Sequence, residues 1–497
     1  MQKRYIAFIL AILMLVSCFS GCGGNEINNN VETTAKPEIT TVKQYDDNSF
    51  KLSYTQADSL DPFKCASQNN QVLASLVFES LFDINESYEA TPNIATGYTF
   101  TDSKTLKVDI NTNLKFSNGR SITIDDVLYS SKAALKSKAY SSALSCIKSV
   151  YSEGNSIYFN LRYANPYAVN LLSFPIASCK DDKNGFPVGS GRYRYSKKDG
   201  DTVLTANKTD DFNPYFTTIS LVNIAAQDSI DNAVNIGNIS FAFRDMSTDT
   251  SKRFSCNKKM VAMNNLVYIG INSYSGITSN SNIRKAINLA VDREALAENA
   301  YSGYANPATS TFNPDFKGID EIKLFSVNAD ISSAKQAVYQ SGYDDSKLNI
   351  RILVNNNANK VAVANLIKSQ LELVGFRVTI DRQNQKNYIK KITDTNFDIY
   401  IGEVKLSDDM SLYPFFSSNG GVRYGVNGKK FTCDNLYFGF LSGNNELGKF
   451  ILAFNDEMPY VPLIYRKGML CYSKALNGDI QGYNGNLFSN IDTWNYN

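Results

Sequence analysis

The chain has 497 residues, of which 43% are hydrophobic and 20% charged, the proportions of a folded protein that is longer than one hydrophobic core usually supports. The 50 lysines and arginines nearly balance the 48 aspartates and glutamates, and no basic run is visible, which argues against nucleic acid as a partner. Histidine is absent, which removes Ser-His-Asp and Cys-His catalysis and the commonest zinc ligand.

The first 22 residues have the pattern of a bacterial export signal. Lys3 and Arg4 precede an apolar run, residues 5–16, that is short for a membrane span. Two cysteines follow, Cys18 in "LVSC" and Cys22 in "FSGC", and both contexts resemble the lipobox in which a cysteine is diacylated. We favour Cys22 because the polar stretch "GGNEINNN" begins soon after it, and a cleaved signal without lipid is the alternative.

Residues 23–47 are rich in Asn, Thr, Lys and Glu and have no apolar period, so we expect a flexible tether between the membrane and the folded part. Folding is expected to begin near Phe50. Apolar and polar residues alternate in "FKLSY", "LKVDINTNLKF" and "SIYFNLR", which predicts strands there. The run "QVLASLVFESLF", residues 71–82, predicts a helix.

Two adjacent carboxylates, Asp125 and Asp126, stand in "KFSNGRSITIDDVLYSS", residues 115–131. Thr123 and Asp126 form the pattern of a capping box ahead of an apolar run. Carboxylates that divide acid and base catalysis must converge on one substrate from environments that separate their pKa values, which neighbours on the first turn of a helix rarely do. We therefore interpret this pair as the start of a helix.

Strands and helices alternate in the second half of the chain. Apolar strands are expected at 348–354, 376–380 and 397–404, separated by a helix whose apolar positions run from Val363 to Val374 and by a second short helix. This β-α-β-α-β order predicts a largely parallel sheet covered on both faces, with ligand sites beyond the carboxyl ends of its strands.

Residues 282–300, "NIRKAINLAVDREALAENA", predict one amphipathic helix. Its apolar stripe begins at Ile283 and continues through Ala290 and Val291. We place Arg284 and Asp292 on the polar side of this helix, because charged side chains are rarely buried.

The six cysteines outside the signal are scattered without CxxC spacing, which argues against a metal site and leaves their pairing open. The nearest approach to a phosphate loop, "GGVRYGVNGKK" at 420–430, lacks the first glycine and the Ser or Thr of that motif. We expect no cofactor and no metal. Glycoside hydrolysis by two carboxylates remains an enzymatic alternative because it needs only Asp and Glu.

Eight segments carry a family resemblance. They are "SLDP" (59–62), "VFESLFDIN" (77–85), the stretch 91–130 around the capping box, "PVGSGRYRY" (187–195), "LVYIGINSYSG" (266–276), "IRKAINLAVDREALAENAYSGYANPA" (283–308), "ISSAKQAVYQSGY" (331–343) and "DEMPYVPLIY" (456–465). In order and spacing they resemble the extracellular solute-binding proteins, family 5, of peptide, oligopeptide and nickel ABC importers. The resemblance extends from about residue 50 to the C-terminus.

The resemblance implies an α/β fold of the periplasmic-binding-protein-like II type, in its large peptide-binding form. Two α/β lobes would be joined by a hinge of two crossing segments, near "LVYIGINSY" and "LCYSKALNG", and one sublobe would be inserted. Lobe I would comprise 48–60, 186–262 and 476–497, the inserted sublobe 61–185, and lobe II 263–475.

The implied function is that of a non-enzymatic, lipid-anchored receptor on the extracellular face of the bacterial cell membrane. Such a receptor binds an oligopeptide-like solute in the cleft between its lobes and delivers it to the permease subunits of an ABC importer. Closure of the cleft is then a population shift driven by the ligand's higher affinity for the closed state.

Peptide binders of this family carry a Trp followed by an Asp, which takes the peptide's amino terminus, after the strand equivalent to 397–404. Here the segment reads "GEVKLSDDMSLYPFF", residues 402–416, and the one Trp of the chain, Trp494, is far away in sequence. Glu403 stands roughly where the Trp would. This departure keeps a non-peptide solute, an oligosaccharide or a metal chelate, as an alternative ligand, and the missing histidines argue against a nickel site that uses one.

The candidate ligand-binding residues come from places where the family presents groups to the cleft. They are Thr55, Gln56, Asn272, Glu403, Lys405, Asp408, Asp409, Tyr413 and Phe415. Each has a structural alternative, since aromatic side chains are often core residues and adjacent Asp residues are common on solvated loops.

Overall fold

The computed structural model describes residues 49–496 except 249–252, 320–322, 418–419 and 422–430. The expected signal, its candidate lipidation sites Cys18 and Cys22, and the tether lie outside the described residues. Within the described ranges, no helix is both long and apolar enough to cross a bilayer.

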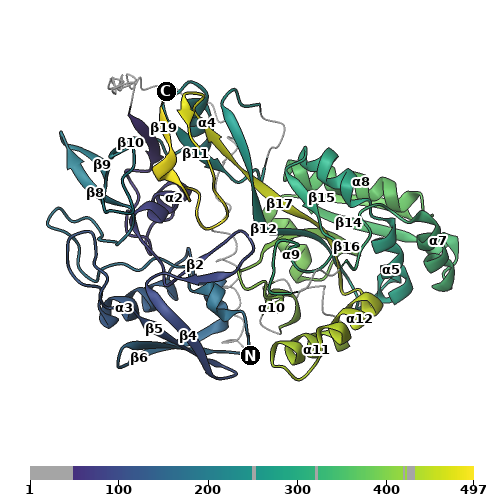
Figure 1. The fold of residues 1–497 in the computed structure, drawn as a ribbon. Helices are drawn as coiled ribbons and strands as arrows, with labels where there is room; N and C mark the ends of the chain where they lie inside the picture. The colour runs from purple at the N-terminus through teal and green to yellow at the C-terminus, as the bar shows by residue number, and fades with distance from the viewer. Residues whose placement is uncertain (1–48, 249–252, 320–322, 418–419, 422–430, 497) are drawn as a thin grey trace, which may run out of the picture. The chain divides into compact units, whose positions relative to one another are not determined.

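Two long antiparallel strands, β12 (Asn257–Ile271) and β17 (Tyr460–Tyr472), occupy the middle of an 11-stranded sheet (Figure 1). The strand order is β15-β14-β16-β12-β17-β11-β1-β10-β9-β8, and β13 pairs with β17 off this path. The remaining bounds are β15 Arg377–Gln383, β14 Asn349–Asn355, β16 Ile399–Lys405, β13 Ala305–Pro307, β11 Phe241–Arg244, β1 Phe50–Tyr54, β10 Thr218–Asn223, β9 Asp201–Ala206 and β8 Tyr193–Lys198.

The expected β-α-β-α-β unit is confirmed, but the expectation of a largely parallel sheet is wrong, because β12 is antiparallel to both β16 and β17. β14 is parallel to both β15 and β16, and the intervening helices are α8 (Ala358–Glu372) and α9 (Gln385–Thr393). Asn357 caps α8 by accepting from the Lys360 N–H, and the helix buries Val363, Ile367 and Leu371 against the sheet. The carboxyl end of β16 therefore leads directly into the segment that contains four of the nine candidate ligand residues.

A separate four-stranded antiparallel sheet has the order β4-β5-β7-β6 (Ala95–Asp102, Thr105–Ile110, Ser156–Leu161 and Ile147–Glu153). Helix α3 (Ile124–Ala134) contacts β6 and β7 of this sheet. The helix starts with the expected capping box between Thr123 and Asp126, and the Asp126 side chain is fully buried.

Burial alone would raise the pKa of Asp126. Hydrogen bonds from Arg120, at 2.5 Å, and from Thr123 outweigh burial and lower this pKa to about 2. The carboxylate thus holds α3 in place, which confirms the structural interpretation of the Asp125 and Asp126 pair.

The helix expected at 71–82 is shorter than the sequence predicts. Helix α2 spans Gln68–Val77, and the chain then turns extended toward β2 (Phe82–Ile84), which pairs with β3 (Ala90–Pro92). The Val77 carbonyl accepts from the Gly191 N–H, and the Glu79 carbonyl accepts from the Ile176 N–H. These long-range hydrogen bonds occupy carbonyls that would accept backbone N–H groups if the helix continued, and the helix ends at Val77.

The single helix expected at 282–300 is also corrected. Helix α5 (Ser281–Ala290) ends early, and Asp292 then caps a new turn, α6 (Arg293–Ala295), which a π-helical turn follows. Arg284 is buried, which contradicts its expected place on the polar side. Its guanidinium donates to the backbone carbonyls of Glu457, Thr278 and Ser279, so three acceptors offset the cost of burial.

The other helices are α4 (Gln227–Asn235), α7 (Ile331–Gln340), α10 (Tyr413–Phe416), α11 (Thr432–Leu441) and α12 (Leu447–Glu457), and the last strands are β18 (Leu476–Asn477) and β19 (Asn495–Tyr496). The C-terminal end returns to the start of the folded chain. Trp494 is fully buried, with its ring centroid 5.4 Å from that of Phe241 and 6.1 Å from that of Phe50 in β1.

Candidate functional site

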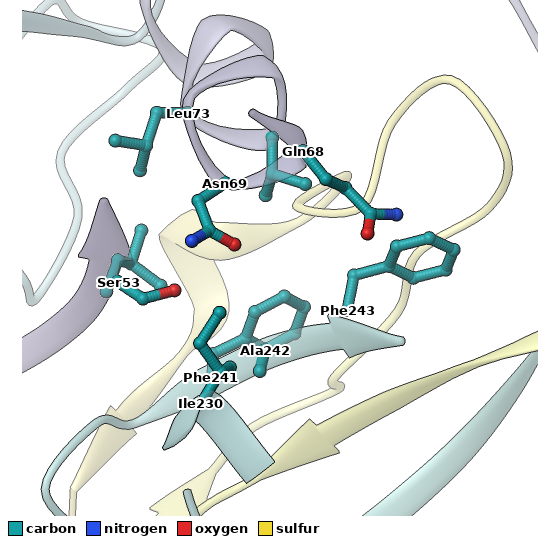
Figure 2. A pocket seen from close by; sticks show the side chains of 10 residues that line it. Ser53, Gln68, Asn69, Leu73, Ile230, Phe241, Ala242 and Phe243 are labelled. Carbon is teal, nitrogen blue, oxygen red and sulfur yellow. The ribbon is translucent and has the colours of Figure 1, made fainter. Parts of the chain in front are cut away.

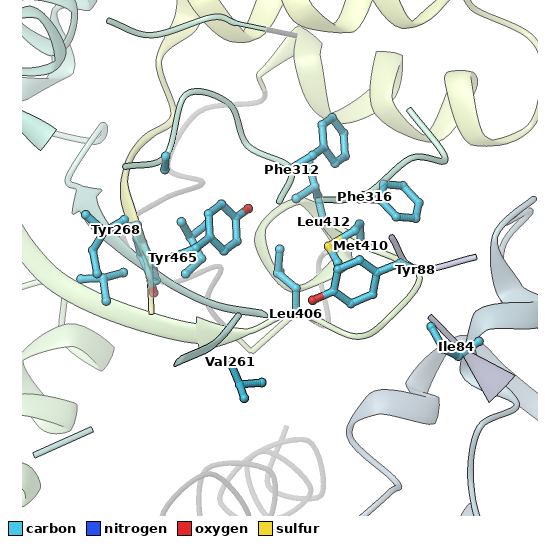
Figure 3. Packing of buried hydrophobic residues seen from close by; sticks show 14 of the residues in the cluster. Ile84, Tyr88, Val261, Tyr268, Phe312, Phe316, Leu406, Met410, Leu412 and Tyr465 are labelled. Atoms are coloured by element: carbon cyan, nitrogen blue, oxygen red, sulfur yellow. The ribbon is translucent and has the colours of Figure 1, made fainter. Parts of the chain in front are cut away.

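The segment after β16, residues 406–416, is where four of the nine candidate residues lie. Its apolar residues are buried, and Figure 3 shows Leu406, Met410 and Leu412 gathered beside Tyr88 and Phe316. Tyr88 belongs to the turn between β2 and β3, so residues far apart in sequence pack together here. The segment is therefore not a solvated surface loop.

Asp409 contacts a second distant part of the chain, residues 163–170. Its carboxylate accepts from Asn165 Nδ2 at 2.6 Å, from Ser407 Oγ at 2.5 Å and from the Ser411 N–H at 3.1 Å. The Tyr163 hydroxyl hydrogen bonds with Ser411 Oγ, and the Tyr163 ring stacks on Tyr413 with centroids 4.9 Å apart and planes 8° apart. Polar and aromatic contacts together hold the 406–416 segment against residues 163–170.

Asp408 lies in a chain of amide hydrogen bonds. Asn264, in an irregular part of β12, donates to Asp408 Oδ1 at 3.2 Å and accepts from Asn313 Nδ2 at 2.8 Å. Asn313 in turn reaches the Tyr88 hydroxyl at 3.4 Å, and Asn170 Nδ2 donates to the backbone carbonyls of both Tyr88 and Asp408. These amide side chains join the 406–416 segment to β12, to the turn at Tyr88 and to residues 163–170.

The two neighbouring carboxylates are electrostatically unusual. Burial raises the pKa of Asp408 to about 6, with a further increase from Asp409 and an opposing effect of Lys405. Burial likewise raises the pKa of Asp409, against the hydrogen bonds that favour its charged form. Buried acids that hold their protons this strongly gain from a nearby positive charge.

Glu403 lies in β16 within a different cluster, the buried ion-pair network of Glu403, Lys360, Arg466 and Asp245. Its carboxylate meets Lys360 Nζ at 3.0 Å and Arg466 Nε at 2.7 Å, and it also accepts from Asn265 Nδ2. The side chains of Glu403 and Arg466 are 5% and 2% exposed. Burial would raise the pKa of Glu403, but the two cations lower it to about 2, so Glu403 is ionised and paired within the protein.

Thr55 and Gln56 follow β1 at another place. The Thr55 backbone hydrogen bonds with the Asn70 side chain, and its buried hydroxyl has no hydrogen-bond partner among the described residues. Gln56 is exposed, and its N–H donates to Asn223 Oδ1.

A small hollow lies beside β1, the strand that precedes Thr55 and Gln56, and is lined by residues of β1, α2, α4 and β11. Figure 2 shows Asn69 and Gln68 of α2 opposite Ala242 and Phe243 of β11. Its lining is mainly apolar and includes neither Thr55 nor Gln56.

Asn272 closes the turn after β12. Its N–H donates to the Asp398 carbonyl, its side-chain amide donates to the Phe397 carbonyl, and its side-chain oxygen accepts from the Tyr274 N–H. All of these contacts are local to the turn and the start of β16, so the polar groups of Asn272 are used by the fold.

The structure therefore divides the nine candidates. Asp408, Asp409 and Tyr413 meet the loops at Tyr88 and 163–170, whereas Phe415 is buried and stacks on Tyr460, with centroids 3.9 Å apart. Lys405 is exposed at the end of β16. Glu403 belongs to the buried ion-pair network, and Thr55, Gln56 and Asn272 lie in other local clusters.

Sequence reasoning missed several residues of these clusters, namely Tyr88, Tyr163, Asn165, Asn170, Asn264, Asn313, Lys360 and Arg466. Arg466 carries a signal that could have been used, because a charged residue in the apolar run "YVPLIYRKGML" must have a buried partner. Among the described residues, no group of three or more His, Cys, Asp or Glu side chains is placed to hold a metal ion.

The buried ion-pair network generates a stability prediction. Glu403→Gln leaves Lys360 and Arg466 buried without their shared anion, so we expect a loss of about 3–5 kcal/mol in the free energy of unfolding. Because the folded pKa of Glu403 lies below 4.5, its stabilisation is present above pH 4.5 and is lost as the pH falls toward about 2.

Urea unfolding at pH 7 measures the effect. The matched control is Glu372→Gln, which removes the half-exposed partner of Lys368 and should cost less than about 1 kcal/mol. Equal losses for the two variants would contradict a buried network.

Comparison with known proteins assigns the chain to a family. Residues 89–422 match the model of the bacterial extracellular solute-binding proteins, family 5, middle region. The chain is 23% identical to the oligopeptide-binding protein AppA of Bacillus subtilis over 480 residues, which cover 86% of each chain. It is also 23% identical to the nickel-binding protein NikA of Staphylococcus aureus over 321 residues, 61% of this chain and 64% of that protein.

The fold comparison agrees. The crystal structure of the substrate-binding protein CtaP from Listeria monocytogenes superimposes with a TM-score of 0.70 at 19% identity, covering 91% of this chain and all of that one. The mixed α/β fold is thus the one expected from sequence. The glycosidase alternative is set aside, because this is a family of solute receptors and not of enzymes. The chain belongs to the bacterial extracellular solute-binding proteins of family 5, the substrate-binding components of ABC importers.

Proposed function

We propose that this chain is a lipid-anchored receptor on the outer face of a bacterial membrane, which binds an oligopeptide-like solute between its lobes and delivers it to the permease subunits of an ABC importer. The observation that carries the proposal is the family match over residues 89–422. The likeness to AppA supports a peptide-like ligand. The signal-like first 22 residues support export and anchoring at Cys22 or Cys18.

The division into lobes that accompanies this function assigns 48–60, 186–262 and 476–497 to lobe I, 61–185 to the inserted sublobe and 263–475 to lobe II. β12 and β17 support it, because they are the strands that connect the parallel unit of β14, β15 and β16 to the strands around β1. Bending of these two strands would separate the 406–416 segment from the loops at Tyr88 and 163–170 and admit a ligand.

Asp408 is the proposed contact for a cationic group of the ligand. The Asp409 carboxylate already has three donors from the protein. Asp408 instead accepts from the uncharged donors Asn264 and Ser173, and its raised pKa means that its charged form lacks compensation. A ligand ammonium group supplies that compensation, and a charge-assisted hydrogen bond of this kind stabilises by roughly 1.5–3 kcal/mol.

A second candidate ligand is a non-peptide solute, such as a metal chelate or an oligosaccharide. The absence of a Trp from the 402–416 segment and the likeness to NikA favour it. A metal chelate would be held through its organic ligand, because among the described residues no cluster is placed to coordinate the ion directly.

Ligand capture tests the function. Residues 25–497, purified under native conditions from the producing bacterium, should carry a bound small solute. Denaturing the protein releases this solute, and mass spectrometry identifies it. Adding that solute at a hundredfold excess over its dissociation constant should stabilise the chain by about 2.7 kcal/mol in denaturant unfolding. The peptide ligand is rejected if no peptide co-purifies with the chain or stabilises it, while a chelate or a sugar does both.

The anchor has its own test. Bacteria fed radiolabelled palmitate should label the full chain, and Cys22→Ala should abolish the label while Cys18→Ala leaves it. The reverse pattern moves the lipid to Cys18. A label that survives in the double variant contradicts lipidation at either cysteine.

The proposed role of Asp408 predicts a pH dependence. Because its pKa is raised to about 6, binding of an ammonium group below that pH must expel a proton from Asp408. The affinity for a peptide with a free amino terminus should therefore fall by about tenfold per pH unit below 6 and be constant above it, whereas the N-acetylated peptide shows no such fall. Calorimetric titration between pH 4.5 and 8 measures both.

Asp408→Asn should remove this pH dependence and the preference for the free amine, with a loss of about ten- to a hundredfold in affinity. Asp456→Asn, a change at an exposed carboxylate, is the control and should bind like the parent. A free-amine preference that persists in Asp408→Asn would exclude Asp408 and direct attention to Asp409.

A further inference from the structure

Two cysteines lie together at one end of the central strand pair. Cys256 immediately precedes β12, and Cys471 is the penultimate residue of β17. In the antiparallel register Lys258 is opposite Cys471. Because side chains alternate along a strand, Cys256 lies on the same face as Lys258 and is a diagonal neighbour of Cys471.

Both side chains are buried in one small hydrophobic cluster that is separate from the main core. The cluster also contains Met246, Phe254 and Met469, and Cys256 and Cys471 are 7% and 1% exposed. The two thiols are electrostatic neighbours, since each shifts the pKa of the other. No sequence pattern singles out this pair, because 215 positions separate its members.

The surroundings of Cys256 favour a thiolate. The hydrogen bond from Cys471 lowers the pKa of Cys256 below that of an ordinary thiol, with support from Lys258 and from the Tyr472 N–H, and Cys471 keeps its proton more strongly. Burial instead raises the pKa of Cys65 and of Cys146 to about 12. Cys256 is thus far better suited to nucleophilic attack on a disulfide than Cys65 or Cys146.

We propose that Cys256 and Cys471 are a disulfide-forming pair that links β12 to β17. The oxidant is a disulfide, either a small one such as oxidised glutathione or that of a thiol oxidoreductase. This inference rests on the export that the proposed function includes, because the outside of the cell lacks the reducing systems of the cytosol.

The chemistry is thiol–disulfide exchange. The Cys256 thiolate attacks one sulfur of the oxidant, which releases the other sulfur as a thiolate and leaves a mixed disulfide on Cys256. Cys471 then loses its proton and attacks the Cys256 sulfur, which releases the second oxidant thiolate. The two protein thiols lose two protons and two electrons in total, and the oxidant disulfide becomes two thiols. The low exposure of Cys471 is no obstacle because the second step is intramolecular.

The bond would join the two strands on which both lobes depend. It closes a loop that contains nearly all of β12 and β17 and every element between them, so the register of the two strands could no longer slip or separate at this end. A cross-link across so long a loop restricts the unfolded chain strongly. We therefore expect the oxidised form to unfold at a higher temperature than the reduced form.

The test uses the full chain. It is incubated with excess oxidised glutathione at pH 8, denatured, alkylated with iodoacetamide, digested without reduction and analysed by mass spectrometry. The expected product is one cross-linked pair of peptides containing Cys256 and Cys471, lighter by two hydrogens than the sum of the free peptides, with Cys433 alkylated as the internal control. Dithiothreitol should restore alkylation at both positions.

Variants and a stability measurement complete the test. Cys256→Ser or Cys471→Ser should abolish the cross-linked pair, and Cys433→Ser should leave it. The thermal midpoint should rise on oxidation in the parent and stay constant in the double serine variant. Full alkylation of both cysteines after oxidation, stable glutathione on Cys256, or a bond from either cysteine to another partner would overturn the proposal, and this mapping on the parent decides it even if a variant does not fold.

Discussion

The pairing of β12 with β17 is the constraint on which the rest of the structure depends. Neither strand has a partner that could replace the other, since β16 lies on the far side of β12 and β11 on the far side of β17. The parallel unit and the strands around β1 are joined into one sheet only through this pair. A change in its register would therefore move every group that the two sides present to each other.

Two features of this pair position the 406–416 segment. Irregular register between Ala262 and Leu266 places Asn264 where it can reach both Asp408 and Asn313. Nearby, the buried ion-pair network ties Arg466 of β17 to Glu403 of β16, which keeps the strand that precedes the 406–416 segment in a fixed position. Local irregularity and buried charge thus set the direction in which the carboxylates of that segment point.

The sequence was most informative where local rules decide the structure. The capping box at Thr123 and the alternation of strands and helices from 348 to 404 depend on nearest neighbours and periodicity, and both appear as expected. The early end of α2 and the burial of Arg284 depend on hydrogen bonds from distant residues, which no local pattern encodes.

The candidate site shows the same limit. The 402–416 segment was found through its resemblance to a family, whereas its partners Tyr163 and Asn165 come from residues some 240 positions earlier and have no motif of their own. An Asn in the sequence gives no sign of whether it will be buried. Its role becomes evident only when the fold places it beside a buried carboxylate that lacks a cation.

The burial of Trp494 against Phe50 and Phe241 has a consequence for the order in which the chain folds. The first strand of the folded part cannot complete its packing until residue 494 has been synthesised and released. Contacts that span almost the whole chain are slow to form, because a very long loop must close before they contribute to stability. Contacts of this kind keep the growing polypeptide incompletely folded for longer than contacts between neighbouring segments would.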